Sequence, residues 1–271
     1  MPTYDYALSV SSVAEMLQQN FTITGIARHF HVNRGTVYGV IRRSGVGDVS
    51  KFRISQKFNQ DFFESVDSEE KAYWLGFLFA DGCVFVKGSI FRVQINISSV
   101  DGNHLNKWHE SIRSCHRVTR FGDAVRSVHH SKKMCDDLIS LGCVPRKSLV
   151  LEFPTIDRGL VRHFIRGYFD GDGCISWHKN KNNHKGGMRL TFIGTESFLG
   201  SLQDILCREV RVRRKKLCSG DSRIYALHIG GYQESKRIAT WMYDGASLSL
   251  ERKKRKYDRL KKEMESSIGN I

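Results

Sequence analysis

The chain has 271 residues, of which 40% are hydrophobic and 26% charged, so it is long enough for one large or two to three small globular domains, and a disordered chain is excluded. Its formal net charge is +15, and because the basic residues are spread over several segments among apolar ones, we expect a folded surface for nucleic acid rather than a basic tail. No apolar run reaches the roughly 20 residues of a membrane span, the N-terminus lacks a secretory pattern and the seven cysteines form no CxxC pair, so we expect a reducing, cytoplasmic location.

Residues 10 to 43 are expected to form a compact helix-turn-helix unit within a domain of residues 1–45. A first helix is predicted to begin at Val13 behind a Ser11/Ser12 cap, a second covers 24–30, and Asn33 caps a third over 34–43. In helix-turn-helix modules the recognition helix enters the major groove, although an ordinary three-helix bundle is the alternative. The DNA contacts predicted on this helix are Arg34, Thr36, Tyr38 and Arg42. Residues 46–66 are expected to be a linker, since 44–55 is rich in Gly, Ser, Lys and Arg.

Two stretches further along the chain are versions of one another. They run from Trp74 to Cys83 (WLGFLFADGC) and from Ile165 to Cys174 (IRGYFDGDGC). Each has small residues at its third and seventh positions, an Asp at the eighth and Gly-Cys after it, which predicts an apolar helix that ends at Asp-Gly. Small residues four apart leave one side of a helix nearly bare, so the two helices are expected to pack backbone to backbone. The packing positions are Gly76, Ala80, Gly167 and Gly171.

This packing would bring Asp81 and Asp172 together at one end of the helix pair. A carboxylate at a helix C-terminus is repelled by the helix dipole, and two neighbouring carboxylates repel each other. A hard divalent cation would offset both effects, because it takes oxygen ligands from carboxylates, water and phosphate. We therefore predict a Mg²⁺ site at these two residues, which Mn²⁺ or Ca²⁺ could also occupy. The alternative is that each Asp-Gly only terminates its helix.

The two motifs belong to two copies of one longer pattern, residues 67–157 and 158–271. Each copy is predicted to run helix-strand-strand-helix-strand-strand-helix, and Asp81 and Asp172 lie 91 residues apart. The fold class is therefore α+β, with two pseudo-symmetric αββαββα repeats whose antiparallel sheets form a saddle. The strands are expected at 83–86, 91–97, 116–121 and 124–129 in the first copy and at 174–177, 188–193, 210–213 and 223–229 in the second, where a loop covers 178–187.

One face of each predicted sheet carries polar and basic side chains. Antiparallel sheets can bury one face and leave the other wet, and Arg, Asn and Gln are the residues that read guanine and adenine edges in the major groove. We therefore expect these faces to contact double-stranded DNA, although a merely solvated face is the alternative. The predicted contacts are Arg92, Gln94, Asn96 and Arg126 in the first copy, and Arg189, Thr191, Arg211, Arg213, Arg223 and Tyr225 in the second.

Metal-bound carboxylates beside a basic saddle indicate phosphodiester hydrolysis. Each copy is followed by a similar short segment, Val144-Pro145-Arg146-Lys147 and Leu250-Glu251-Arg252-Lys253. Lys147 and Lys253 are therefore candidates for ordering the attacking water or stabilising charge in the transition state, or else for a general phosphate contact.

Taken together, the two motifs, their order and their spacing resemble the LAGLIDADG homing endonucleases of the single-chain, two-repeat type. The resemblance covers about residues 58–258. It implies that Asp81 and Asp172 are catalytic, magnesium-binding acids, that a monomer binds a long asymmetric duplex, and that cleavage leaves short 3′ overhangs. The first motif departs from the family at its sixth position, where Phe79 replaces the acid that the second motif keeps as Asp170. The N-terminal unit is not part of the family's core fold.

Two other functions are compatible with the same fold. One is a non-catalytic DNA-binding transcriptional regulator, although such a protein usually loses the acids that this chain keeps. The other is an intron RNA maturase, as an alternative or an added activity. Cleavage of DNA in the presence of magnesium separates the endonuclease from the regulator.

Overall fold

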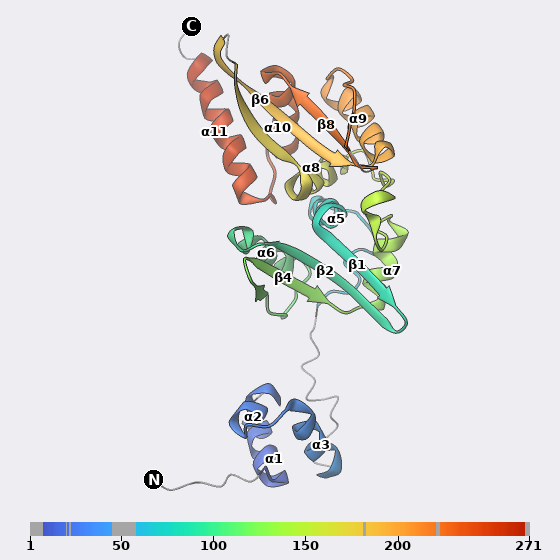
Figure 1. The fold of residues 1–271 in the computed structure, drawn as a ribbon, viewed down its shortest axis with the longest axis vertical. Coiled ribbons are helices and arrows are strands. Elements are labelled where there is room, and N and C mark those ends of the chain that lie inside the picture. Colours follow the sequence, from blue (N-terminus) through green and yellow to red (C-terminus); the bar gives the residue numbers. More distant parts are fainter. Residues whose placement is uncertain are drawn as a thin grey trace. The chain divides into compact units, whose positions relative to one another are not determined.

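The computed structural model divides the chain into two compact units, Met1–Lys57 and Phe58–Ile271 (Figure 1). The structure describes residues 8–19, 21, 23–44, 58–180, 183–220 and 223–268. Among the helices described there, none is both long and apolar enough to cross a membrane.

The described part of the N-terminal unit consists of α1 (Val10–Gln18), α2 (Ile23–His29) and α3 (Arg34–Ser44). Each helix contributes to a small apolar core. That core is separate from the core of the second unit. Its fully buried members are Val13, Ile26, Val37 and Ile41.

The helix starts of this unit follow from side-chain caps. α1 begins at Val10 rather than Val13, because its N-cap is Ser9, whose hydroxyl accepts a hydrogen bond from the Ser12 amide at 3.1 Å. α3 begins behind the predicted cap, since Asn33 Oδ1 accepts from the amide of Thr36 at 2.9 Å.

The second unit begins at Phe58, so the predicted linker over 46–66 is wrong for residues 58–66. Phe62 and Phe63 are buried in the core of this unit, and the Asn59 amide donates to the carbonyl of Ile112 at 2.6 Å. The Gly, Ser and basic residues that indicated a linker lie before this segment. Residues 46–57 of the predicted linker lie outside the described residues.

The second unit contains two repeats with the same order of elements, as predicted. The strands form two four-stranded antiparallel sheets with equivalent orders, β1-β2-β4-β3 and β5-β6-β8-β7. The first repeat consists of α5 (Glu69–Asp81), β1 (Gly82–Lys87), β2 (Ile90–Ser98), η1 (Ser99–Asp101), α6 (Asn103–Ser111), β3 (Thr119–Phe121), β4 (Ala124–His129), α7 (Lys132–Ser140) and η2 (Lys147–Leu149). The second consists of α8 (Val161–Asp172), β5 (Cys174–Asn180), β6 (Asn183–Gly194), α9 (Glu196–Val210), β7 (Cys218–Ser219), β8 (Tyr225–Gly230), α10 (Tyr232–Tyr243) and α11 (Glu251–Ile268).

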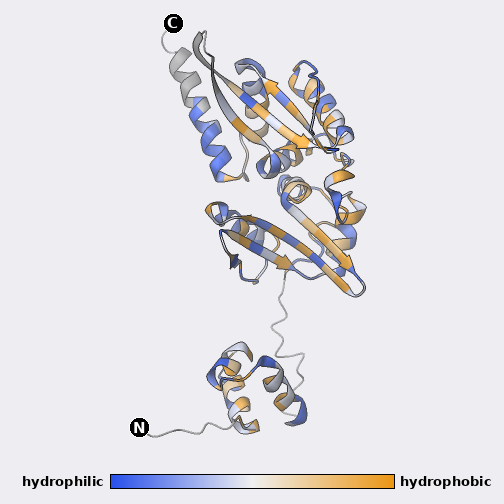
Figure 2. Ribbon diagram, in the orientation of Figure 1, coloured by the Kyte–Doolittle hydropathy of each residue, from blue (hydrophilic) through white to orange (hydrophobic). Residues whose placement is uncertain are grey.

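Helices α5 and α8 pack against each other between the two sheets (Figure 1). Alternation of side chains along the strands determines which face of each sheet is buried. In β2, Val93, Ile95 and Ile97 are buried and the residues between them are not. Figure 2 shows hydrophobic and hydrophilic residues alternating along this strand. The buried faces and the helix pair form one continuous apolar core that spans both repeats. The residues that end each helix of the pair are therefore fixed relative to both sheets.

Two local predictions in the second repeat are wrong. Residues 210–213 are not a strand, because α9 continues to Val210 and Arg211 then adopts a left-handed backbone with φ of 55°. The alternation that indicated a strand arises because Val212 is buried in an irregular segment. Residues 178–180 and 183–187 are not a loop, because they belong to β5 and β6, whose backbones pair Asn180 with Asn183, while residues 181 and 182 of the predicted loop lie outside the described residues.

Candidate active site

The two central helices approach so closely that only small residues fit between them. A Cβ atom added to Gly76 would overlap the carbonyl oxygen of Phe164, and one added to Gly167 would overlap that of Tyr73. Near the helix ends, a Cβ on Gly171 would overlap the Cβ of Ala80. The structure thus places all four predicted packing positions in the contact between α5 and α8.

Each helix of the pair ends at its acidic residue, Asp81 or Asp172, and the following glycine is extended. Asp81 is half-buried, and its Oδ2 lies 3.4 Å from the place where a Cβ on Gly171 would stand, so this carboxylate lies against α8. Asp172 is exposed. Within the part of the chain that the structure describes, neither carboxylate accepts a hydrogen bond or forms an ion pair.

The protonation of these two acids reflects their surroundings. Desolvation, followed by the charge on Asp172, raises the pKa of Asp81 to about 6, while Lys253 and Lys147 oppose this shift. Although the Asp172 side chain reaches solvent, the surrounding protein also desolvates its carboxyl group and raises its pKa, against the charges of the same two lysines. Both acids are therefore held where their negative charge is unfavourable, and both lysines are near enough to act on them.

Each predicted lysine binds the C-terminal end of one central helix. Lys147 Nζ donates to the carbonyl of Ala80 at 3.3 Å and to that of Gly82. Lys253 Nζ donates to the carbonyls of residues 169, 170 and 171 at 2.5, 2.8 and 3.2 Å. Their exposed fractions are only 8% and 3%, and burial lowers the pKa of Lys253 to about 8. The lysines offset the negative end of each helix dipole beside its acid.

In the first sheet, all four predicted DNA contacts lie on the face turned away from the core. The register pairs Asn96 with Arg126, and Arg126 Nε donates to Asn96 Oδ1 at 3.0 Å. The guanidinium carbon of Arg126 lies 5.0 Å from the ring centroid of Phe121, and that of Arg92 lies 4.7 Å from the ring of Phe85. The Phe85 ring thus orders Arg92, and the Phe121 ring together with the hydrogen bond to Asn96 orders Arg126, which reduces the entropy lost when these side chains bind a ligand.

The second sheet matches the prediction only in part. Arg189 and Thr191 lie on the equivalent face, where Thr191 Oγ1 lies 3.0 Å from Nδ1 of His228, a residue that the sequence analysis did not single out. Tyr225 was wrongly placed there, because it shares the core-facing side of β8 with Leu227 and Ile229. Three further predicted contacts are exposed but lie outside the strands: Arg211, Arg213 and Arg223.

The predicted contacts on α3 are not equally available. Arg34 and Arg42 are exposed, whereas Thr36 and Tyr38 are half-buried. Thr36 Oγ1 donates to Asn33 Oδ1 at 3.2 Å, and Tyr38 packs against the core of the N-terminal unit. The surface of α3 is thus defined mainly by its arginines.

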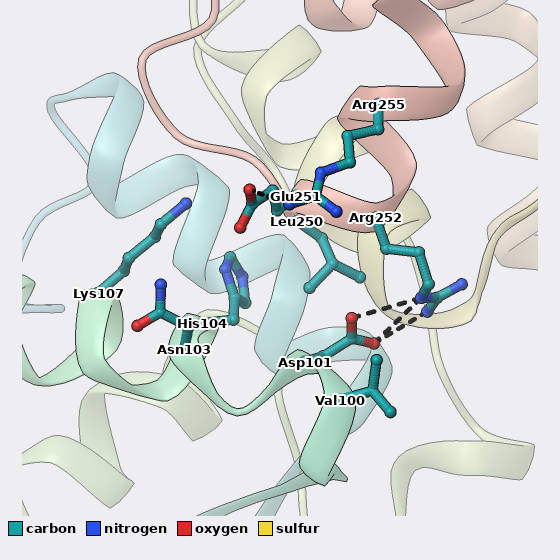
Figure 3. A pocket seen from close by; sticks show the side chains of 9 residues that line it. All are labelled: Val100, Asp101, Asn103, His104, Lys107, Leu250, Glu251, Arg252 and Arg255. Carbon is teal, nitrogen blue, oxygen red and sulfur yellow. Dashed lines mark hydrogen bonds and ion pairs between the residues drawn. The ribbon is translucent and has the colours of Figure 1, made fainter.

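A cavity of about 360 Å³ opens beside Asp81, between the first sheet and the start of α11. Asn96, Ser98 and Asp101 line it from the first repeat, and Arg252 lines it from the second. A smaller neighbouring pocket of about 210 Å³ is shown in Figure 3, where Arg252 and Asp101 point toward each other and their closest ion-pair distance is 3.0 Å. Sequence analysis missed this ion pair because its partners are far apart in the chain.

Comparison with known proteins identifies chains that are similar to this one in sequence or in fold. Residues 159–237 match the family model described as a LAGLIDADG-like domain. No curated protein matches the sequence. Among solved structures, the LAGLIDADG meganuclease I-AabMI bound to uncleaved DNA is 10% identical, with a TM-score of 0.52 over 72% of this chain and 91% of that one. The LAGLIDADG homing endonuclease I-GzeII in complex with its DNA target is 9% identical, with a TM-score of 0.55 over 76% and 93%. The meganuclease I-SmaMI bound to uncleaveable DNA is 8% identical, with a TM-score of 0.53 over 72% and 90%.

Sequence identities this low show a shared fold but do not show a shared activity. The likeness to these structures covers 72% to 76% of this chain, which is more than either repeat alone. Residues 159–237 of the second repeat are therefore similar to a LAGLIDADG-like domain, and the chain has the two-repeat fold of the LAGLIDADG endonucleases.

Proposed function

We propose that the protein is a site-specific double-strand DNA endonuclease of the homing type, which hydrolyses phosphodiester bonds with a divalent metal and leaves short 3′ overhangs. The observation that carries this proposal is the pair of acids Asp81 and Asp172. Both carboxylates lack a partner among the described residues, and they stand together at the ends of two helices that touch through glycines. Nothing in the packing requires acids there, so a function is the better explanation.

The donor chemistry of this site fits a hard cation such as Mg²⁺, with Mn²⁺ or Ca²⁺ as possible substitutes. The described residues contain no group of three or more His, Cys, Asp or Glu side chains that could hold a metal, which argues against a closed structural site. Two carboxylates leave positions for water and phosphate, as Mg²⁺ requires. When bound, the metal would polarise the scissile phosphate and activate a water molecule.

The residues of the chain would then hold the metal and the substrate in place. Asp81 and Asp172 would be the metal ligands, and Lys147 and Lys253 would keep positive charge beside the reacting phosphate. The DNA would lie on the polar faces of the two sheets, in a monomer whose repeats each contact one half of the target. The net charge of +15 supports this, as do the similar structures that are described as bound to DNA.

Plasmid cleavage tests the proposal directly. A plasmid library that spans candidate target sites is incubated with the protein and Mg²⁺, and we expect linear product with short 3′ overhangs. Asp81→Asn and Asp172→Asn are expected to reduce cleavage by about a thousandfold or more, because they remove metal ligands, while binding measured in Ca²⁺ is largely kept. Full cleavage by both variants would overturn the site, and sequence-specific binding without any cleavage would favour the regulator.

A further inference from the structure

Asp170, the acid at the sixth position of the second motif, is held in a buried network of hydrogen bonds. Its side chain is 1% exposed. Its Oδ1 accepts from the hydroxyl of Tyr243 at 2.5 Å, and its Oδ2 accepts from the hydroxyl of Tyr73 at 2.8 Å and from the Leu250 amide at 2.6 Å. A buried carboxylate that accepts three hydrogen bonds fixes the positions of its three donors, because losing any donor leaves the negative charge poorly compensated.

The network joins the two repeats. Tyr73 uses its proton on Asp170, so at its contact of 2.9 Å with His104 the histidine Nε2 must be the donor. This requires the neutral ring protonated at Nε2, which is consistent with burial lowering the pKa of His104 to about 3. A directed chain of hydrogen bonds thus leads from α6 through α5 to Asp170 on α8.

The same network fixes the segment that carries Lys253. The carbonyl of Leu250 accepts from the Lys253 amide at 3.0 Å, so the lysine follows Leu250 within a single helical turn. Asp170 binds the amide of Leu250, and Lys253 Nζ in turn binds the carbonyls of Phe169, Asp170 and Gly171. The start of α11 is therefore attached to the end of α8 twice, once through the carboxylate and once through the lysine.

In the first repeat, no carboxylate among the described residues makes an equivalent attachment, although Cys143 Sγ donates to the carbonyl of Leu78 at 3.7 Å. The residue equivalent to Asp170 is Phe79, which packs in the core with a ring distance of 5.1 Å to Phe164. Lys147 instead follows a left-handed residue, Arg146 with φ of 57°, and its Nζ donates to the carbonyls of Ala80 and Gly82. The two lysines are equivalent by repeat but are held by different means.

We infer that Asp170 is a positioning residue that holds Lys253 in the second half of the active site, an inference that rests on the proposed endonuclease function. In Asp170→Asn one of the two carboxylate oxygens becomes a donor, so the Leu250 amide and the two tyrosine hydroxyls can no longer all be accepted, and the start of α11 that carries Lys253 is held less firmly at the end of α8. Because Lys147 does not depend on Asp170, the two strands of the target should respond unequally. Asp170 would thus act on cleavage without contacting metal or DNA.

Strand-resolved cleavage provides the first test. In Asp170→Asn and in Tyr243→Phe we expect cleavage of one strand to slow about tenfold more than cleavage of the other, so that nicked plasmid accumulates before linear product. The slow strand should be the one that Lys253→Ala slows and not the one that Lys147→Ala slows. Phe79→Leu is the matched control in the first repeat. It should not selectively slow cleavage of the strand that Asp170→Asn slows. Equal slowing of both strands in Asp170→Asn and Tyr243→Phe would overturn the inference.

Hydrogen exchange provides a second test that needs no cleavage. In Asp170→Asn we expect amides of residues 244–253 to exchange faster than in the unaltered chain, while those of residues 143–150 keep their rates. Unchanged exchange in 244–253, or faster exchange in both segments, contradicts the inference even if the protein cleaves nothing. Failure of the proposed function would instead appear as no cleavage by the unaltered chain.

Discussion

At the scale of single residues, the buried His129 makes the stability of this fold depend on pH. It stacks on His116 with ring centroids 4.3 Å apart, and His109 lies edge-on at 5.3 Å. Burial, and then the neighbouring charges of His116, His109 and His130, lowers the pKa of His129 from its ordinary value to about 3. The folded chain therefore resists a proton that the unfolded chain accepts below about pH 6.5.

Between about pH 6.5 and pH 3 the unfolded state binds a proton at His129 that the folded state does not, so stability is lost as the pH falls, by up to about 1.4 kcal/mol per pH unit. We expect His129→Gln to lower the free energy of unfolding at pH 7 but to flatten its decline toward pH 5, as measured by urea denaturation across that range. The exposed neighbour provides the control, since His130→Gln should keep the slope of the unaltered chain. Identical slopes for all three proteins would contradict this role of His129.

At the scale of elements, the two sheets present different surfaces at equivalent places. The pair Asn96 and Arg126 of the first sheet corresponds in register to Ile193 and Ala226 of the second. On the proposed endonuclease, the first pair offers hydrogen bonds to purine edges, whereas the second offers only apolar contact, such as that with a thymine methyl group. The two halves of the target should therefore be read with unequal stringency.

Selection of binding sites from a randomised duplex library in Ca²⁺ tests this difference. We expect Arg126→Ala to relax the base preference at one position of one half-site, with a loss of discrimination of about 1–3 kcal/mol. Ile193→Ala, the matched change in the other sheet, should relax its half-site by less, because apolar contact discriminates weakly. Equal losses in the two halves would show that the register asymmetry does not set specificity.

The same elements show which features could be predicted from sequence. The helix pair and its acids could be predicted because the glycine spacing and the Asp-Gly ends are local signals, and the strand with Val93 and Ile95 could be predicted from alternation. Alternation misled at 210–213, where a buried Val212 lies in an irregular segment. The hydrogen-bond network of Asp170 could not be predicted from sequence. Its partners Tyr73, Tyr243 and Leu250 lie 97, 73 and 80 residues away in the chain, and only the fold brings them together.

At the scale of the whole molecule, the chain joins two independently cored units that are both basic. The N-terminal unit has its own buried apolar cluster, and its described residues include the exposed Arg34, Arg42 and Arg43 on α3. The proposed active site, its lysines and both sheets belong to residues 58–271. The residues proposed for cleavage and the arginines of the N-terminal unit thus lie in different units of the chain. We propose that the N-terminal unit adds a second contact with the same DNA duplex.

Deletion of residues 1–57 tests this division. We expect residues 58–271 to stay folded and to cut the same target in Mg²⁺, because the deletion removes no part of their core. Binding should weaken by about tenfold or more, since a tethered second contact raises affinity through its effective concentration, and the footprint should shorten. The dependence of affinity on salt should also become shallower, as fewer phosphates are neutralised. Arg34→Ala with Arg42→Ala in the full chain should reproduce most of this loss, whereas Glu15→Ala, which alters the same unit on α1, should not. An unchanged footprint and affinity after the deletion would show that the N-terminal unit does not contact this DNA.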